Sequence, residues 1–265
     1  DTLIYELQLT NDYVSSFYND NRIPNHGFDA ITKELQLLKI ENTYLEPLSL
    51  KKIVSISLTT NDLVTFLQKF KEYYPTLEQF SKRIEVTKQI IEQIDAVINR
   101  FNEVKDDASP LLLELRQQIN KLKGKINSSF TSALNTYHNL DYLDDIRESV
   151  VDNRRVLAVK AMYRRKVKGA IMGGSKTGSI VYIEPETTLN HSRELNNLEY
   201  EEHEEEIRIL KELTNYLRLF LPLIKNYQEF LTDVDVISAK AKYAKSMDAI
   251  LPEISTDREI YLRDA

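Results

Sequence analysis

Residues 169–185 read GAIMGGSKTGSIVYIEP, and the fold depends on what this glycine-rich stretch forms. A phosphate-binding loop needs Gly, four residues, Gly, Lys, then Ser or Thr, followed by a helix whose N-terminus holds the phosphates. Aligning Lys176 with the lysine of that pattern places Ser175 and Ala170 where the two glycines belong. The residues from Thr177 onward are mostly β-branched or aromatic, which predicts a strand and not a helix. The stretch is therefore not a phosphate-binding loop.

The same residues predict a β-hairpin, with strands at 167–172 and 177–183 and a turn at 173–176. A hairpin is an exception in this chain, because its composition favours helices. Six glycines and seven prolines among 265 residues are few, which is typical of long helices with few turns. We therefore expect a mainly α fold that carries one small antiparallel β unit.

Composition also excludes several classes of protein. The chain has no cysteine, so disulfides and thiolate chemistry are ruled out. No apolar run approaches the roughly 20 residues that span a bilayer, and Asp1 does not open a signal peptide. We expect no membrane partner and a cytoplasmic location. Because the chain begins at Asp1 and ends at Ala265, we expect it to be a piece of a longer protein.

Charge is distributed unevenly along the chain. The net charge is −6, yet residues 153–183 hold eight basic residues and no Asp or Glu. The rest of the chain then carries 27 basic and 41 acidic residues. A segment without acids inside an acidic protein indicates contact with a polyanion, since acids are normally interspersed on a solvated surface.

Apolar spacing predicts helices on both sides of the basic segment. Ser109 and Pro110 form a helix start, with Ser as the N-cap and Pro at the first helical position. Pro75 and Pro222 are interpreted as helix ends. The predicted helices span 1–18, 28–40, 49–74, 85–101, 109–140, 187–221 and 226–247, and their apolar stripes are ordinary helical core.

Two of these helices are long. The apolar residues of 109–140 recur at alternating steps of three and four residues, which predicts a coiled-coil partner helix. At ~1.5 Å per residue this helix is about 48 Å long. The stretch Glu199–Glu206 is so charged that we expect it to project into solvent. We expect two antiparallel lever helices that carry a β clamp. The predicted segments are a helical core 1–108, outgoing lever 109–150, clamp 151–185, returning lever 186–222, and core return and linker 223–265.

No catalytic or metal site is predicted. His203 lies in a run of glutamates, but Tyr200 precedes it by three residues and Ile207 follows it by four, so neither ligand spacing is present. Asp106-Asp107 and Asp144-Asp145 lie beside helix ends, where capping and the helix dipole explain them.

The basic segment is thus the one functional signal. Lys and Arg that neutralise phosphates provide affinity without reading sequence. No base-reading helix or stacking platform is recognisable in it, which predicts a grip on the nucleic-acid backbone. An alternative is a structural coiled-coil arm whose basic pad docks ribosomal RNA or an acidic protein. The candidate binding residues are Arg154, Arg155, Lys160, Arg164, Arg165, Lys166, Lys168 and Lys176.

Three stretches resemble the MutS family of ATPases, and most closely its type-two branch, over essentially the whole chain. They are VKDDASPLLLELRQQINKLKGKI from Val104, the run from Asn153 to Leu213, and DVISAKAKYAKSMDAILPEI from Asp235. The most distinctive pattern is VKG at 167–169, then Ser175, Gly178 and IEP at 183–185. In this resemblance the chain is the core, lever and clamp region.

The resemblance implies a homodimer whose clamps close around duplex or branched DNA. It implies an ATPase domain after Ile260–Ala265, with ATP and Mg²⁺ as cofactors of the whole protein. In this chain itself we expect no cofactor and no catalytic activity. Similar proteins are bacterial and related to mismatch-repair proteins; they suppress recombination, and some handle stalled ribosomes. The resemblance therefore also implies that the protein is associated with the nucleoid. The turn GGSKT at 173–177 departs from the more acidic or polar loop of similar proteins, which implies a different binding preference at the clamp tip.

Overall fold

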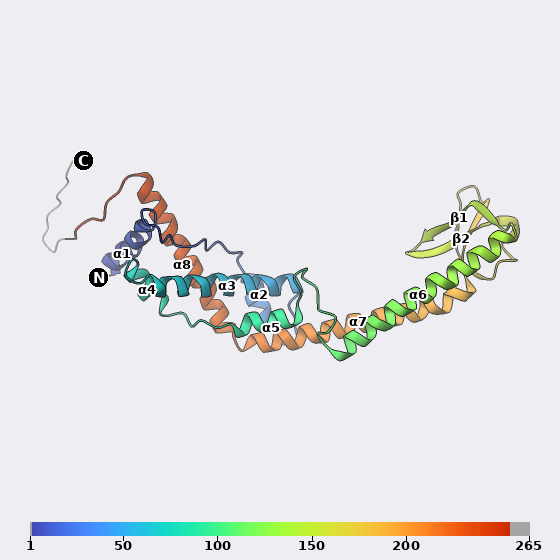
Figure 1. The fold of residues 1–265 in the computed structure, drawn as a ribbon, viewed down its shortest axis with the longest axis horizontal. Helices are drawn as coiled ribbons and strands as arrows, with labels where there is room; N and C mark the ends of the chain where they lie inside the picture. The colour runs from blue at the N-terminus through green and yellow to red at the C-terminus, as the bar shows by residue number, and fades with distance from the viewer. Residues whose placement is uncertain (1, 255–265) are drawn as a thin grey trace. The chain divides into compact units, whose positions relative to one another are not determined.

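The computed structural model describes residues 2–254, which contain eight α-helices and four β-strands (Figure 1). The chain divides into two compact units. Unit 1 comprises the residues up to Lys105 together with those from Leu210 onward, and unit 2 comprises Asp106–Ile209. Residues 255–265 of the predicted core return and linker 223–265 lie outside the described residues. No helix among residues 2–254 combines the length and apolarity needed to cross a membrane.

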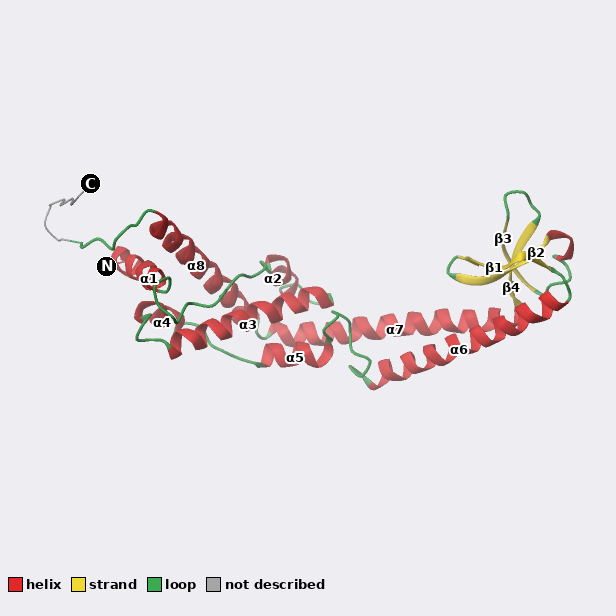
Figure 2. Cartoon of the chain, turned by 45° about the horizontal axis from the view of Figure 1, so that its top comes forward, coloured by secondary structure: helices red, strands yellow, loops and turns green. Residues whose placement is uncertain are grey.

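Unit 1 is helical and is built around α3 and α8 (Figure 2). α8 contacts α1, α2 and α3, and α3 also contacts α4 and α5. The predicted apolar stripes form its core, in which Ile53 and Leu63 of α3 and Phe230 of α8 are buried. Its elements are α1 (Thr2–Ser15), α2 (Thr32–Leu38), α3 (Pro47–Lys69), α4 (Pro75–Ser81), α5 (Gln89–Val97), the end of α7 (Glu186–Arg218) and α8 (Leu221–Ser246).

Two prolines begin helices, and the prediction that they end helices was wrong. α3 already ends at Lys69, and Pro75 is the first residue of α4. In the same way α7 ends at Arg218, and Pro222 lies in the first turn of α8. Proline is well suited to a first turn, because its N–H would have no partner there and its φ angle is already helical.

Asp12 of α1 caps α4, and no local sequence pattern marks this contact. Its Oδ2 accepts hydrogen bonds from the backbone N–H groups of Thr76 at 2.7 Å and Leu77 at 3.1 Å. Burial raises the pKa of the Asp12 carboxyl, although both hydrogen bonds act to lower it. The contact supplies the acceptor that an N-cap side chain normally provides.

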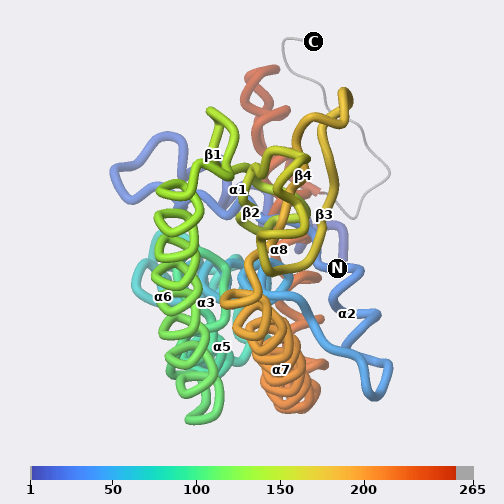
Figure 3. The backbone as a smooth tube through the Cα atoms, turned by 90° about the vertical axis from the view of Figure 1, so that its right-hand side faces the viewer, coloured from blue at the N-terminus to red at the C-terminus, as the bar shows by residue number. Residues whose placement is uncertain are grey.

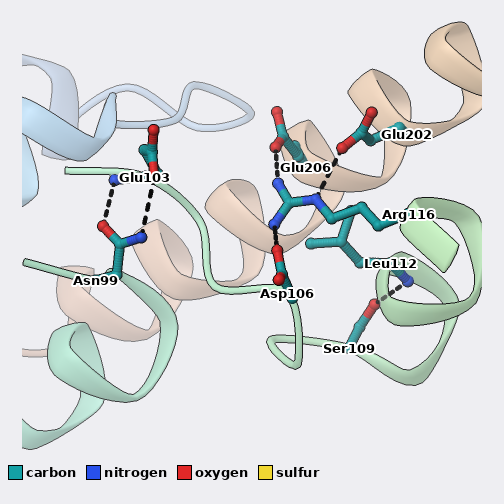
Figure 4. Close-up of polar contacts among 8 residues, drawn as sticks. All are labelled: Asn99, Glu103, Asp106, Ser109, Leu112, Arg116, Glu202 and Glu206. Atoms are coloured by element: carbon teal, nitrogen blue, oxygen red, sulfur yellow. Dashed lines mark hydrogen bonds and ion pairs between the residues drawn. The ribbon is translucent and has the colours of Figure 1, made fainter. Parts of the chain in front are cut away.

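The predicted helices 28–40 and 85–101 form only over α2 and α5. Asn99 diverts the chain after α5, since its side-chain oxygen accepts from the Phe101 N–H at 2.8 Å. The same oxygen accepts from the Glu103 N–H at 3.0 Å (Figure 4). An Asn side chain that bonds nearby backbone competes with helix in this way.

Unit 2 contains two long antiparallel helices, α6 (Pro110–Asn139) and the larger part of α7 (Figure 3). The predicted N-cap is confirmed: the Ser109 hydroxyl accepts a hydrogen bond from the Leu112 N–H at 3.0 Å. The same hydroxyl donates to Glu205 of α7 at 2.6 Å. The cap thus also joins the beginning of α6 to its neighbour.

A cluster that we call the Arg116 clasp, formed by Arg116, Asp106, Glu202 and Glu206, joins the same helices (Figure 4). The guanidinium donates from Nε to Glu202 at 2.8 Å and from Nη2 to Glu206 at 2.5 Å, and it also pairs with Asp106. Hydrogen bonds with Glu202 and Asp106 raise the pKa of Arg116 against the opposing effect of burial.

The charged stretch Glu199–Glu206 of α7 is mostly exposed, as predicted, but one of its acids is buried. Glu205 is 4% exposed and pairs with Arg208 at 2.6 Å, a contact that lowers the pKa of the Glu205 carboxyl. His203 is exposed, as expected for a solvated face. Acids can be buried here because neighbouring helix residues supply the cations.

A four-stranded antiparallel sheet in unit 2 lies where α6 ends and α7 begins (Figure 2). Its strands are β1 (Leu143–Val151), β2 (Arg154–Lys160), β3 (Gly169–Gly174) and β4 (Ile180–Pro185), in the order β1-β2-β4-β3. β1 lies in the segment 109–150 that we assigned to the outgoing helix. The alternation of buried and exposed residues typical of a strand is interrupted in β1, because the register shifts between Leu143 and Glu148. Arg147, in this interval, has a φ of 59°.

The predicted hairpin is confirmed as the antiparallel pair of β3 and β4, although both strands begin two or three residues later than predicted. Gly169 is required by close packing: a Cβ there would lie 2.1 Å from the Glu184 carbonyl oxygen. Phe130 of α6 packs beneath the sheet, so that helix and sheet share one core of Phe130, Leu143, Leu157, Val159, Val167 and Ile183.

Candidate nucleic-acid interface

Three of the eight predicted binding residues form ion pairs with acids just outside the acid-free segment. Arg154 pairs with the buried Glu184 at 2.9 Å, and Arg155 pairs with Glu148 at 2.6 Å. Lys160 pairs with Asp141 at 2.9 Å. An ion pair reduces the charge that a side chain offers to a polyanion, so these three offer less net charge than the sequence suggests.

The contacts of these three residues are structural. Arg155 also lies over the ring of Phe130, with its guanidinium carbon 4.2 Å from the ring centroid, and it donates to Asn127 at 3.3 Å. The hydrogen bond between Lys160 and Asp141 raises the pKa of the lysine and lowers that of the carboxyl. Arg155 and Lys160 thus help to hold β2 against neighbouring parts of unit 2.

The other five, which we call the basic patch, are Arg164, Arg165, Lys166, Lys168 and Lys176. All five side chains are exposed, and within the described part of the chain none has a carboxylate partner. The sheet connections position them. Arg164, Arg165 and Lys166 follow one another in the turn after the 3-10 helix Ala161–Tyr163, and Lys168 directly precedes β3. Lys176 lies in the turn between β3 and β4.

The turn that carries Arg164, Arg165 and Lys166 is anchored on both sides. The Lys166 N–H donates to the Tyr163 carbonyl at 2.8 Å, and Val167 is buried in the core. This hydrogen bond and the buried Val167 fix the backbone of the turn, so the three cations project from one short segment although their like charges repel.

A stack of three tyrosines lies beside this turn, and no local sequence pattern marks it. The ring centroids of Tyr142 and Tyr163 are 4.6 Å apart, and those of Tyr137 and Tyr142 are 6.4 Å apart. The Lys166 Nζ lies 5.7 Å from the Tyr142 ring and 5.9 Å from the Tyr163 ring. Cation–π contacts of this kind orient the lysine without neutralising it.

The turn that resembles a phosphate-binding loop connects two strands. The Ser175 N–H donates to the Ile180 carbonyl at 2.9 Å, and the Gly178 N–H donates to the Ser175 carbonyl at 2.9 Å. Gly178 has a φ of 72°, which favours glycine. Because the turn leads into β4 and not into a helix, its amide groups are not arranged to cradle phosphates.

Metal binding is not supported within residues 2–254, where no three His, Cys, Asp or Glu residues are grouped in a way that holds an ion. A cavity of about 380 Å³ lies between α6, α7 and the turn joining β1 to β2. Arg154, Glu184 and Lys123 line it, but each is already paired. The exposed cations, and not this cavity, are the feature that fits a polyanion.

No family model matches the chain. It is 34% identical over 201 residues to Endonuclease MutS2 of Carboxydothermus hydrogenoformans, an alignment that covers 76% of this chain. It is 29% identical to the protein of that name in Caldicellulosiruptor saccharolyticus over 91% of this chain, and 29% identical to that of Agathobacter rectalis over 99%. The chain is related to the MutS2 proteins. It spans 26%, 30% and 34% of these three MutS2 relatives, respectively.

Proposed function

We propose that unit 2 binds the sugar–phosphate backbone of duplex or branched DNA through the basic patch. The observation that carries the proposal is that five exposed cations, none with a carboxylate partner among residues 2–254, lie on connections of one small sheet. The MutS2 relatives are named endonucleases, a class of enzyme that acts on nucleic acid, and this supports a nucleic-acid partner.

The chemistry of the patch favours contact with phosphates over recognition of bases. Lys and Arg neutralise phosphates and release condensed counterions, which provides affinity independent of sequence. The glutamates of α7 repel a polyanion, so DNA is expected at the sheet and not along this helix. If all five cations contact phosphates, the logarithm of the binding constant falls with the logarithm of salt concentration with a slope of about −4.5.

The larger assembly follows as part of the same proposal. In it α6 and α7 act as a lever and the sheet as a clamp, and two copies of the whole protein form a homodimer that encloses DNA. A further domain binds ATP and Mg²⁺ and hydrolyses ATP, and the protein acts in the bacterial cytoplasm, associated with the nucleoid, to suppress recombination. The resemblance to MutS-family ATPases and the MutS2 relatives support these statements.

Fluorescence anisotropy with labelled duplex DNA and a four-way junction tests the interface at two salt concentrations. The variant R164E/R165E should abolish measurable binding, because it reverses two adjacent cations of the patch. The control variant K121E/K211E changes the charge equally at two exposed lysines and should bind within about threefold of the unchanged protein. Lys121 lies about 27 Å along α6 from Asn139 and Lys211 about 37 Å along α7 from Glu186, and charges beyond a Debye length are screened.

Equal binding by the two variants would refute the basic patch as the interface. Duplex RNA of the same sequence provides the second comparison. Tight binding to RNA or ribosomes with no measurable affinity for duplex DNA would overturn the DNA proposal in favour of the ribosomal alternative.

A further inference from the structure

A groove of about 290 Å³ lies beside the basic patch, between α6, the residue before β3 and the first turn of α7. Its lining is rich in hydroxyl groups and contains one cation and one carboxylate. We call it the hydroxyl groove and define it by Ser129, Ser132, Thr136, Lys168, Glu186 and Thr187. All six residues belong to unit 2.

The hydroxyls of α6 form a row. Ser129, Ser132 and Thr136 are spaced by three and four residues, which places them on one face of the helix. The row extends about 10 Å along the axis. Phosphates follow one DNA strand at an axial spacing of about 3.4 Å, so the row is long enough to lie along two or three of them.

Most of these hydroxyls have no hydrogen-bond partner among residues 2–254. Thr136 donates to the Ser132 carbonyl at 2.9 Å, but among the described residues no hydrogen bond is present for the side chains of Ser129, Ser132 or Thr187. Serine and threonine in helices often bond the carbonyl four residues earlier, as Thr136 does. Ser129 is half-buried in the groove and has free donor capacity there.

Lys168 connects the groove to the basic patch. Its N–H donates to the Tyr137 hydroxyl at 3.2 Å, and its carbonyl accepts from the Glu186 N–H at 3.1 Å. The backbone is therefore held on both sides, whereas the exposed ammonium group has no carboxylate partner in the described part of the chain. Glu186 is the one lining group that opposes an anion.

We propose that the hydroxyl groove is a second contact site for DNA, in which Lys168 and the α6 hydroxyls bind phosphodiester oxygens next to those held by Arg164, Arg165 and Lys166. Hydroxyls donate to phosphate oxygens without reading sequence, and many backbone contacts of DNA-binding proteins are of this type. This inference rests on the proposed function and extends its surface from the sheet connections onto α6.

The test compares two double variants of α6 by anisotropy with a labelled duplex DNA of 30 base pairs. S129A/S132A removes two groove hydroxyls, whereas S128A/T131A removes two exposed neighbouring hydroxyls that do not line the groove. We expect S129A/S132A to weaken binding about three- to tenfold and the control to stay within about twofold. The salt slope should remain unchanged, because a hydroxyl carries no charge, while K168Q should reduce its magnitude by about 0.9.

Glu186 provides a test of opposite sign. E186Q removes a negative charge from the groove and should strengthen binding about two- to fivefold. E204Q makes the same change at an exposed glutamate 18 residues further along α7, about 27 Å away, and should have no effect at 0.15 M salt. Circular dichroism checks that each variant keeps its helix content.

Failure of this inference is distinguishable from failure of the proposed function. If R164E/R165E abolishes binding while S129A/S132A equals its control, the groove is not occupied and the basic patch stands. If E186Q weakens binding, or if S129A/S132A affects duplex RNA alone, the assignment to DNA phosphates is overturned. If the unchanged protein does not bind duplex DNA, both proposals fall.

Discussion

Replacing Arg116 by alanine tests whether the Arg116 clasp holds α6 against α7. The guanidinium is 20% exposed, and its partners Glu202 and Glu206 are 25% and 30% exposed, so both pairs are partly shielded from water. Asp106 is 75% exposed and its pair adds little.

The expected cost follows from these exposures. Each partly shielded, charge-assisted pair contributes about 1 kcal/mol, and loss of Arg116 also leaves two carboxylates one helical turn apart. We therefore expect Arg116→Ala to reduce the stability of the helix pair by about 2–3 kcal/mol. The stability of Arg116→Lys should lie between that of the unchanged protein and that of Arg116→Ala, because an ammonium group cannot form the paired hydrogen bonds of a planar guanidinium.

Lys123→Ala is the matched control. Lys123 also pairs with a glutamate of α7, Glu199, at 3.2 Å, but the side chains are 53% and 44% exposed. An exposed pair of this kind contributes about 0.5 kcal/mol. The two variants thus remove one cation each from the same face of the helix pair and differ mainly in burial.

Hydrogen exchange of the amides of α6 in the intact chain measures the effect locally, which matters because a melting curve combines both units. A loss of 2–3 kcal/mol corresponds to exchange about 30- to 150-fold faster, against about twofold for Lys123→Ala. Equal acceleration of exchange by the two variants would refute the idea that burial determines how much the Arg116 clasp stabilises the helix pair.

Three further predictions follow from unit 2. Gly169→Ala places a methyl group against the Glu184 backbone and should destabilise the sheet by about 3 kcal/mol. Gly124→Ala should stabilise α6 by about 1 kcal/mol, because apart from the neighbouring backbone of α6 itself no described atom lies within 4 Å of the new methyl group. Hydrogen exchange of the β4 and α6 amides measures both effects. Phe130→Ala should cost about 3–5 kcal/mol and reduce the near-ultraviolet dichroism of the tyrosines near it. Arg164→Ala with Arg165→Ala should change the salt slope of duplex binding from about −4.5 to about −2.7, and an unchanged slope would contradict their contact with phosphates.

The basic patch was only partly predictable, for a physical reason. The sequence showed that residues 153–183 lack acids, and from this we predicted eight binding residues. Folding brings Asp141, Glu148 and Glu184 to three of them, although these acids stand outside the segment by 12, 5 and 1 residues. Antiparallel pairing of β1, β2 and β4 creates those neighbours, so no window of sequence reveals them.

Local chemistry was sufficient where each signal was complete within a few residues. Ser109 with Pro110 determined the start of α6, and the turn and strand residues of 169–185 determined a hairpin and excluded a phosphate-binding loop, because caps, turns and strand preferences act over short distances. Only the tertiary structure decided that Asp12 caps α4, that Arg116 gathers three acids, and that the hydroxyls of α6 share a groove with Lys168. Those contacts join residues far apart in the chain, and their free energy depends on distance and burial, which the order of amino acids does not specify without the fold.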